Sequence, residues 1–137
     1  MFGQGVPRDY QRALVWLRKG AEQGDASAEH YIGWMYFSGN RLEKHYGQAA
    51  EWESKAARQG YGPAQDMLSL MYTEGVCVTQ DYVIAYMWLN LAATQFSGDV
   101  LEFMSSRRDQ LAKKMTVEQI ATAQKLTREW KPVPNTK

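Results

Sequence analysis

The sequence has few residues suited to redox or metal chemistry, with one cysteine and two histidines among its 137 residues. The single cysteine, Cys77, cannot form an internal disulfide, so the stability of the fold cannot depend on oxidation. The histidines, His30 and His45, belong to different predicted elements, and neither has a second histidine four residues away or a cysteine pair nearby. The sequence therefore predicts neither a zinc site nor any other cofactor.

Long hydrophobic runs are also absent. The longest apolar stretch, residues 82–93, is interrupted by Asn90, whereas a membrane-spanning helix needs about 20 apolar residues. The first residues lack the basic segment and apolar run of a signal peptide. We therefore expect no membrane insertion and, for the chain as numbered, a cytoplasmic location. If a leader were removed before residue 1, a periplasmic or secreted location would fit equally well.

Neither sign of charge is in clear excess, because 16 Lys and Arg residues stand against 15 Asp and Glu residues. Domains that bind nucleic acid through its phosphates usually carry a clear basic excess, so we expect no nucleic-acid binding. The length fits one domain, and an apolar content of 45% is enough to form a buried core.

The sequence does contain an internal repeat with a step of 36 residues. This step relates Trp16, Trp52 and Trp88; Gly3, Gly39 and Gly75; Tyr10, Tyr46 and Tyr82; Ala13, Ala49 and Ala85; and Ala21, Ala57 and Ala93. Repeats of this length are typical of stacked helical hairpins. We therefore interpret the three tryptophans as filling equivalent spaces between helices rather than as forming a ligand-binding box.

Apolar residues recur at helical spacing within each repeat. Ala49, Trp52 and Ala56 share one face of a helix, and Ala28 and Ile32 share one face of another. Each repeat is thus predicted to hold two helices. The whole pattern predicts helices at residues 8–23, 26–38, 45–59, 62–74, 81–95, 99–113 and 117–130.

Candidate N-terminal caps support this assignment. Asp9 and Asp81 stand where second helices should begin, and His45 is a weaker cap at the equivalent place. Thr116 and Gln119 have the spacing of a capping box at the start of the last helix.

These residues resemble the Sel1-like repeat (SLR) family, which is related to the tetratricopeptide repeats. The middle repeat supplies the family's pattern with Ala28, Ile32, Gly33, Tyr36, Gly39, Leu42, Ala49, Trp52, Lys55, Ala56, Ala57 and Gly60. The next repeat supplies Ala64, Leu68, Tyr72, Gly75, Val78, Asp81, Ala85, Trp88, Ala92 and Ala93. The chain departs from the pattern at Arg41 and Cys77 in the second loop-glycine position, at Ser69 in place of a close-contact glycine, and at Phe96 in place of the closing glycine.

The resemblance implies an all-α fold, a right-handed α-solenoid of antiparallel helix pairs. We expect a single SLR domain over residues 1–137, with about two and a half units and a C-terminal helical cap. Its parts are an incomplete first repeat (1–25), two repeats (26–61 and 62–97), the capping helices (98–131) and a tail (132–137). One face of the first predicted helix therefore lacks its partner. A second copy of the chain, a cognate partner protein or additional residues could cover it, and the sequence does not choose among them.

In SLR-like arrays the first helix of each pair generally lines the concave side, which locates a candidate groove. On the helix at 26–38, His30, Trp34 and Phe37 form a separate stripe. Their equivalents in the next repeat are Asp66, Leu70 and Thr73, and the same register gives Glu102 in the helix at 99–113. We expect these seven residues to bind a partner, with Trp34 as the anchor. The alternative is that Trp34 packs between repeats and that His30 is merely solvated or hydrogen-bonded.

The middle of the chain is acidic, since no Lys or Arg occurs between Arg58 and Arg107 while five Asp and Glu residues do. An acidic groove wall would favour a basic patch on the partner. The alternative is a scattered, solvated surface.

The resemblance implies a non-catalytic scaffold or adaptor that binds a protein or peptide in its groove. A narrower version of the same idea is a bacterial immunity-type protein that neutralises a cognate toxin. A small hydrolase using groove carboxylates and His30 is the alternative from another class. No nucleophile, metal or phosphate-binding motif supports it, so we do not expect an enzyme.

Overall fold

The computed structural model describes residues 8–39 and 45–134 and contains seven helices and no strand in these residues. The helices are α1 (Arg8–Glu22), α2 (Ala26–Ser38), α3 (Tyr46–Arg58), α4 (Gly62–Glu74), α5 (Tyr82–Ala93), α6 (Gly98–Ala112) and α7 (Val117–Glu129). Each predicted helix is present, and its ends lie within two residues of the predicted ones. The all-α prediction is confirmed.

The ends of the helices follow from short-range chemistry. Asp81 accepts a hydrogen bond from the amide of Ile84, and Nδ1 of His45 accepts one from the amide of Gln48, so both are caps as expected. Thr116 and Gln119 form the full capping box. The expectation for Asp9 was wrong, because α1 already begins at Arg8 and places Asp9 inside its first turn.

The loop after α4 keeps the backbone conformation of the family's two-glycine loop, although Cys77 stands in the position of the second glycine. Gly75 ends α4 with φ +70°, and Cys77 then takes φ +72°, a left-handed conformation that side chains other than glycine rarely adopt. Cys77 therefore adopts the conformation expected of the family's loop glycine. Arg41, its counterpart in the previous repeat, lies outside the described residues.

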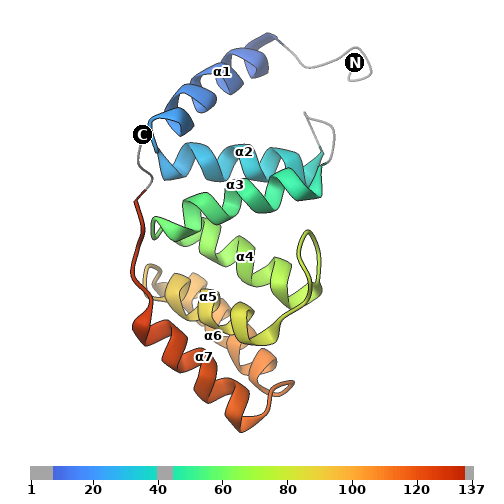
Figure 1. The fold of residues 1–137 in the computed structure, drawn as a ribbon, viewed down its shortest axis with the longest axis vertical. Coiled ribbons are helices and arrows are strands. Elements are labelled where there is room, and N and C mark those ends of the chain that lie inside the picture. The colour runs from blue at the N-terminus through green and yellow to red at the C-terminus, as the bar shows by residue number, and fades with distance from the viewer. Residues whose placement is uncertain (1–7, 40–44, 135–137) are drawn as a thin grey trace.

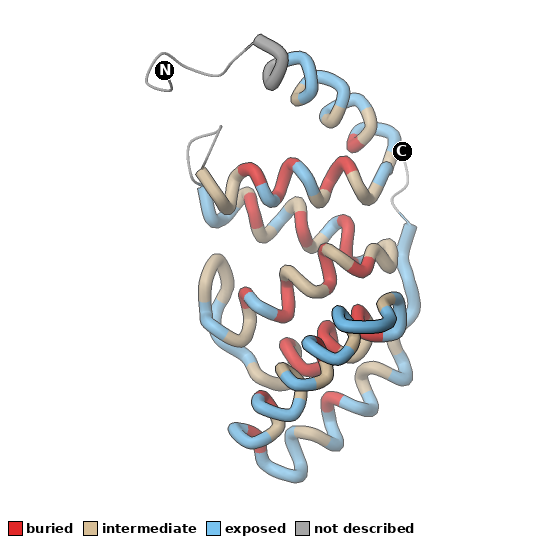
Figure 2. The backbone as a smooth tube through the Cα atoms, turned by 180° about the vertical axis from the view of Figure 1, so that it is seen from behind, coloured by how far each residue is buried: buried red, intermediate tan, exposed pale blue. Residues whose placement is uncertain are grey.

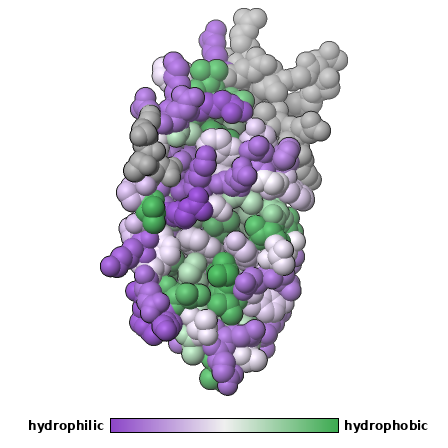
Figure 3. Space-filling model, in the orientation of Figure 1, coloured by the Kyte–Doolittle hydropathy of each residue, from purple (hydrophilic) through white to green (hydrophobic). Residues whose placement is uncertain are grey.

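The helices stack as antiparallel pairs along the long axis of the molecule, with α1 at one end and α6 and α7 at the other (Figure 1). The largest core cluster joins α3, α4 and α5 through small alanines and larger side chains: Ala49, Ala56, Ala57, Ala64, Leu68, Met71, Met87 and Trp88. Alanines at the crossings let the helices approach closely, while the larger residues fill the space beside them. On the face shown in Figure 3, hydrophobic residues gather at the level of α4 and α5 among largely hydrophilic neighbours.

The three repeat tryptophans are not equally buried, which corrects the sequence-based expectation. Trp88 is 8% exposed within the main core, and Trp52 is partly buried against the cluster of α1 and α2. Trp16 is 71% exposed. The indole is buried only where another helix covers that face; α2 packs against α1 but leaves Trp16 in water.

A glutamine hydrogen bond recurs once per complete repeat. Nε2 of Gln59 donates to Oε1 of Glu29 at 2.9 Å, and Nε2 of Gln95 donates to Oε1 of Gln65 at 3.1 Å. Both acceptors are buried, so each bond satisfies a polar group that would otherwise be costly to hide. The 36-residue repeat is therefore found in the buried hydrogen bonds as well as in the apolar residues.

Residues 130–134, which follow α7, turn back along the stack (Figure 1). Trp130 packs edge-on against Trp88, with ring centroids 6.1 Å apart, and the amide of Val133 donates to the carbonyl of Arg58 at 2.7 Å. The tail thereby connects the C-terminal cap to the end of α3.

None of the described helices combines the length and apolar character that a membrane crossing requires.

Candidate partner-binding groove

Helices α2, α4 and α6 border a surface hollow of about 300 Å³, which we call the groove. Its walls come from α2, α4 and α6 and from the loop before α6. The lining residues are His30, Trp34, Pro63, Asp66, Met67, Leu70, Phe96, Val100 and Met104. Four of the seven predicted site residues, His30, Trp34, Asp66 and Leu70, therefore border one hollow.

Exposed apolar side chains mark the rim and walls of the groove. Trp34 is 43% exposed and Leu70 is 41% exposed, and Val100 is exposed beside them. Trp34 is therefore not buried between repeats, as the alternative interpretation required. Large apolar side chains that border a hollow can anchor a partner, because their burial on binding removes apolar surface from water.

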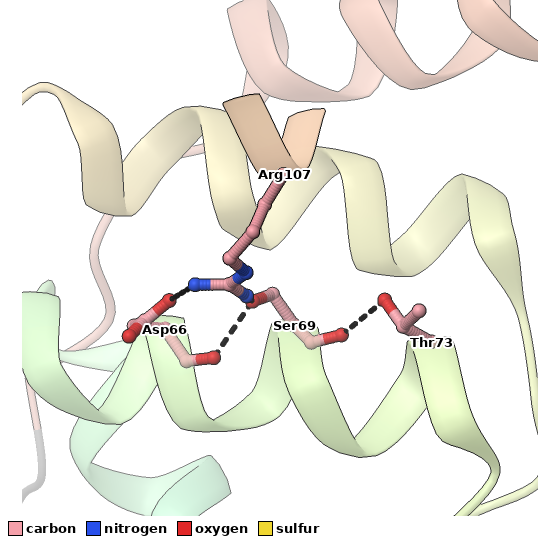
Figure 4. Close-up of polar contacts among 4 residues, drawn as sticks. All are labelled: Asp66, Ser69, Thr73 and Arg107. Atoms are coloured by element: carbon pink, nitrogen blue, oxygen red, sulfur yellow. Dashed lines mark hydrogen bonds and ion pairs between the residues drawn. The ribbon is translucent and has the colours of Figure 1, made fainter. Parts of the chain in front are cut away.

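Asp66 is already paired within the chain. Nη1 of Arg107 on α6 lies 2.6 Å from Oδ1 of Asp66, and Nη2 donates to Oγ of Ser69 at 2.8 Å (Figure 4). Ser69 in turn donates to the backbone carbonyl of Asp66. Arg107 thus offsets the negative charge of Asp66. The groove is therefore less acidic at this point than the sequence alone predicts.

His30 borders the groove and also contacts a buried carboxylate. Its Nδ1 lies 2.7 Å from Oε1 of Glu53 on α3, whose side chain is fully buried. Burial raises the pKa of Glu53 to about 7, and the hydrogen bond and charge of His30 offset part of this rise. Oε2 of Glu53 has no hydrogen-bond partner among the described residues.

The other three predicted site residues do not border the groove. Phe37 stacks on Tyr46, with ring centroids 5.8 Å apart, and Glu102 is exposed on α6. Thr73 donates through Oγ1 to the carbonyl of Ser69 (Figure 4). Thr73 instead lines a second hollow of about 240 Å³ between α4 and α6, which Leu70 and Arg107 also border.

Glu53 and Arg107 bond to the groove residues His30 and Asp66, although the sequence analysis did not select them. For Glu53 a signal was available, because it occupies the repeat position of Leu17 and Leu89, where an apolar residue is the rule in this chain. A carboxylate in an apolar position indicates a buried pair. Arg107 had no such signal, since its partners Asp66 and Ser69 lie far away in the sequence.

The described residues contain no group of three or more His, Cys, Asp or Glu residues that could hold a metal ion.

A comparison with protein families matches the Sel1 repeat at residues 1–25, 26–61 and 62–95. The chain belongs to the Sel1 repeat family. No curated protein matches it closely. Sel1 repeat proteins generally act as protein-interaction scaffolds, and their fold is typically non-catalytic.

Two solved structures support the assignment. One is c5321, a protective antigen of uropathogenic Escherichia coli strains with an SLR fold: it is 33% identical, has a TM-score of 0.80 and aligns over 94% of this chain. The chain spans only 27% of that protein's length. The other is a Sel1 repeat protein from Oxalobacter formigenes, 34% identical with a TM-score of 0.66, which aligns over 73% of this chain and 72% of its own. The likeness confirms the helical solenoid.

Proposed function

We propose that this Sel1 repeat chain is a scaffold that binds a protein segment in the groove between α2, α4 and α6. The observation that carries the proposal is a hollow bordered by side chains from two successive repeats and the C-terminal cap, with Trp34 and Leu70 both partly exposed. A surface built from several repeats can recognise an extended or helical segment that no single repeat could hold.

The groove favours a partner segment with bulky apolar side chains. Its lining is mostly apolar, and the Arg107 guanidinium offsets the charge of Asp66. Binding driven by apolar burial depends weakly on salt, whereas attraction to an exposed acidic wall would be screened at physiological ionic strength. We therefore favour an apolar segment over the basic patch that the sequence alone suggested.

The experiment places a photoreactive amino acid in the groove at Leu70 and, as a matched control, at Val117 on α7, which is more exposed but lies outside the groove. The two proteins are expressed in the native cell, crosslinked and compared. A partner should be captured from position 70 and not from position 117. Equal capture from both positions would count against a groove-specific partner.

The captured partner is then purified and its affinity measured by calorimetry. Trp34→Ala combined with Leu70→Asp should weaken binding at least about tenfold, as expected for a hot spot. Val117→Asp should leave the affinity unchanged, and circular dichroism should show equal helix content in all three proteins. Unchanged binding by the double variant would contradict the proposal.

A further inference from the structure

The second hollow, of about 240 Å³, lies along the same two helices as the groove. The N-terminal halves of α4 and α6 border the groove, and their C-terminal halves border the second hollow. Leu70 borders both. Beside it, Arg107 reaches from α6 across to Asp66 on α4 (Figure 4). Helices α4 and α6 thus form one seam, with a hollow on each side of a ridge made by Leu70 and Arg107.

The second hollow has an apolar floor and a rim that carries both signs of charge. Leu89 and Leu111 form the floor and are 2% and 4% exposed. On the rim, Glu74 lies on α4 and Lys114 just after α6, and both are exposed. Among the described residues neither takes part in an ion pair, although the Lys114 ammonium lies 6.0 Å from the ring centroid of Tyr82. Such a hollow suits an apolar side chain with a charge on each side of it.

The seam is open because of the way the helices stack. Helices α4 and α6 both pack on α5, and Leu89 of α5 lies at the floor of the second hollow. The only buried residues of α6 are Met104 and Leu111, so most of this helix is in water (Figure 2). A further repeat at either end would stack beside α1 or beside α6 and α7, and it would leave the seam itself uncovered.

The distance between the two hollows selects the conformation of a segment that fills both. The parts of α4 that border them are centred about seven residues apart, which is about 10 Å along a helix. A helix presents the same face again after seven residues, at about 10.5 Å. In an extended strand, residues on one face are about 7 or 13 Å apart, so a strand does not match.

A polyproline II segment spans about 10 Å in three residues and therefore also matches the distance. Segments of this kind dock in grooves lined by aromatic side chains. None of the described residues that line the second hollow is aromatic. The seam therefore favours a helix.

We propose that the seam between α4 and α6 binds one helix of a partner protein, with a bulky apolar residue in each hollow. The two anchors are seven positions apart, and a small residue between them passes over Leu70 and Arg107. Beside the second anchor, an acidic residue of the partner pairs with Lys114 and a basic residue pairs with Glu74. This inference rests on the proposed function, because it names the kind of segment that the groove binds and extends the binding surface to the second hollow.

Crosslinking from two positions on α6 tests the conformation of the bound segment. A photoreactive amino acid replaces Val100 in the groove or Gln110 at the second hollow, and Val117 again serves as the control. These two positions are separated by about 15 Å along α6. After crosslinking in the native cell, mass spectrometry should place the two attachment points on one face of a partner helix, seven or eleven residues apart. An extended segment would give about four or five residues.

The outcomes separate this inference from the proposed function. Capture of a partner from position 100 but not from 110, or attachment points four or five residues apart, would overturn the helix and leave the groove as a binding site. Attachment of position 110 to another part of this chain would also overturn the inference. Absence of a partner at both positions would overturn both proposals.

Substitutions at the second hollow test its contribution to affinity for the purified partner. Gln110→Trp, which fills the hollow, should weaken binding at least about tenfold, whereas Asp109→Trp on the exposed face beside it should not. Lys114→Glu should slow association at least about twofold at low salt, and Lys113→Glu, with the same change of charge outside the hollow, should slow it less. Circular dichroism should show equal helix content in all four variants. Unchanged affinity of Gln110→Trp would contradict the inference even if the groove variants lose binding.

Discussion

Nδ1 of His30 lies 2.7 Å from Oε1 of Glu53, and this contact links a residue of the groove to a fully buried carboxylate. Space for the carboxylate exists because Gly33 has no side chain: a Cβ there would lie 2.9 Å from Cγ of Glu53. In the next repeat Ser69 and Leu89 occupy the two equivalent positions. Glycine and glutamate thus occur together in the repeat that contains His30.

The pair gives the stability of the chain a distinctive pH dependence. Unfolded, the Glu53 carboxyl loses its proton near pH 4.5, whereas in the fold it keeps the proton up to about pH 7. Between these values the folded state binds more protons, so the free energy of unfolding should fall as pH rises, by up to about 3 kcal/mol. Glu53→Gln should remove this fall.

Urea unfolding at pH 4.5, 6 and 7.5 tests this expectation. Glu51→Gln is the matched control, because Glu51 lies on the same helix with its side chain exposed. The control should keep the wild-type slope. If the free energy of unfolding still fell with pH in Glu53→Gln, other titratable groups would be its cause.

Gly33→Ala should destabilise the chain by about 1–3 kcal/mol, since the added methyl group would lie 2.9 Å from Cγ of Glu53, whose side chain is buried and bonded to His30. Gly47→Ala on α3 is the comparison, because its Cβ would meet nothing closer than 3.8 Å. That change should be neutral or stabilising by up to about 1 kcal/mol. Thermal unfolding should therefore shift to lower temperature in Gly33→Ala alone, and an equal loss in both variants would be evidence against the contact.

Trp88→Ala should cost about 3–5 kcal/mol, because it leaves a cavity in the main core and removes the partner of Trp130. Trp16→Ala should change the free energy of unfolding by less than about 0.5 kcal/mol, since its indole is largely in water. Chemical denaturation of both variants checks the contrast. Equal losses at the two positions would mean that Trp16 is covered in solution.

Asp66 and Arg107 should be energetically coupled. In a double-mutant cycle with Asp66→Asn and Arg107→Gln, the coupling should be about 0.5–3 kcal/mol, because the guanidinium bonds both Asp66 and Ser69. The cycle is measured by urea unfolding at low and high salt, and the coupling should shrink as salt rises. Glu102→Gln in place of Asp66→Asn provides a control that should show no coupling with Arg107.

Most of the fold could be predicted because it depends on short-range patterns that repeat. Glycines mark the turns, and the spacing of alanines and larger apolar residues marks the helices. The same register located His30, Trp34, Asp66 and Leu70 on the first helices of two successive pairs, which the structure brings to one hollow. A stripe defined by periodicity alone extends further than the hollow does, which is why Phe37 and Thr73 fall outside it.

The contacts that escaped prediction depend on how helices cross. Glu53 meets a residue of α2, and Arg107 meets residues of α4 from a cap that does not follow the repeat. Periodicity also treats the three tryptophans as equivalent. Their burial depends on a neighbouring helix, so the tryptophan of the first predicted helix, one face of which lacks a partner, departs from the other two.

The contact of Val133 with Arg58 changes how the stack should come apart. In a linear array each unit contacts only its neighbours, so the ends can unfold one hairpin at a time. Here Val133 is bonded to the end of α3, on which α2 packs, so the part from α2 to α7 should melt cooperatively while α1 frays first. The end of the molecule that opens most easily is thus the one that carries Trp16.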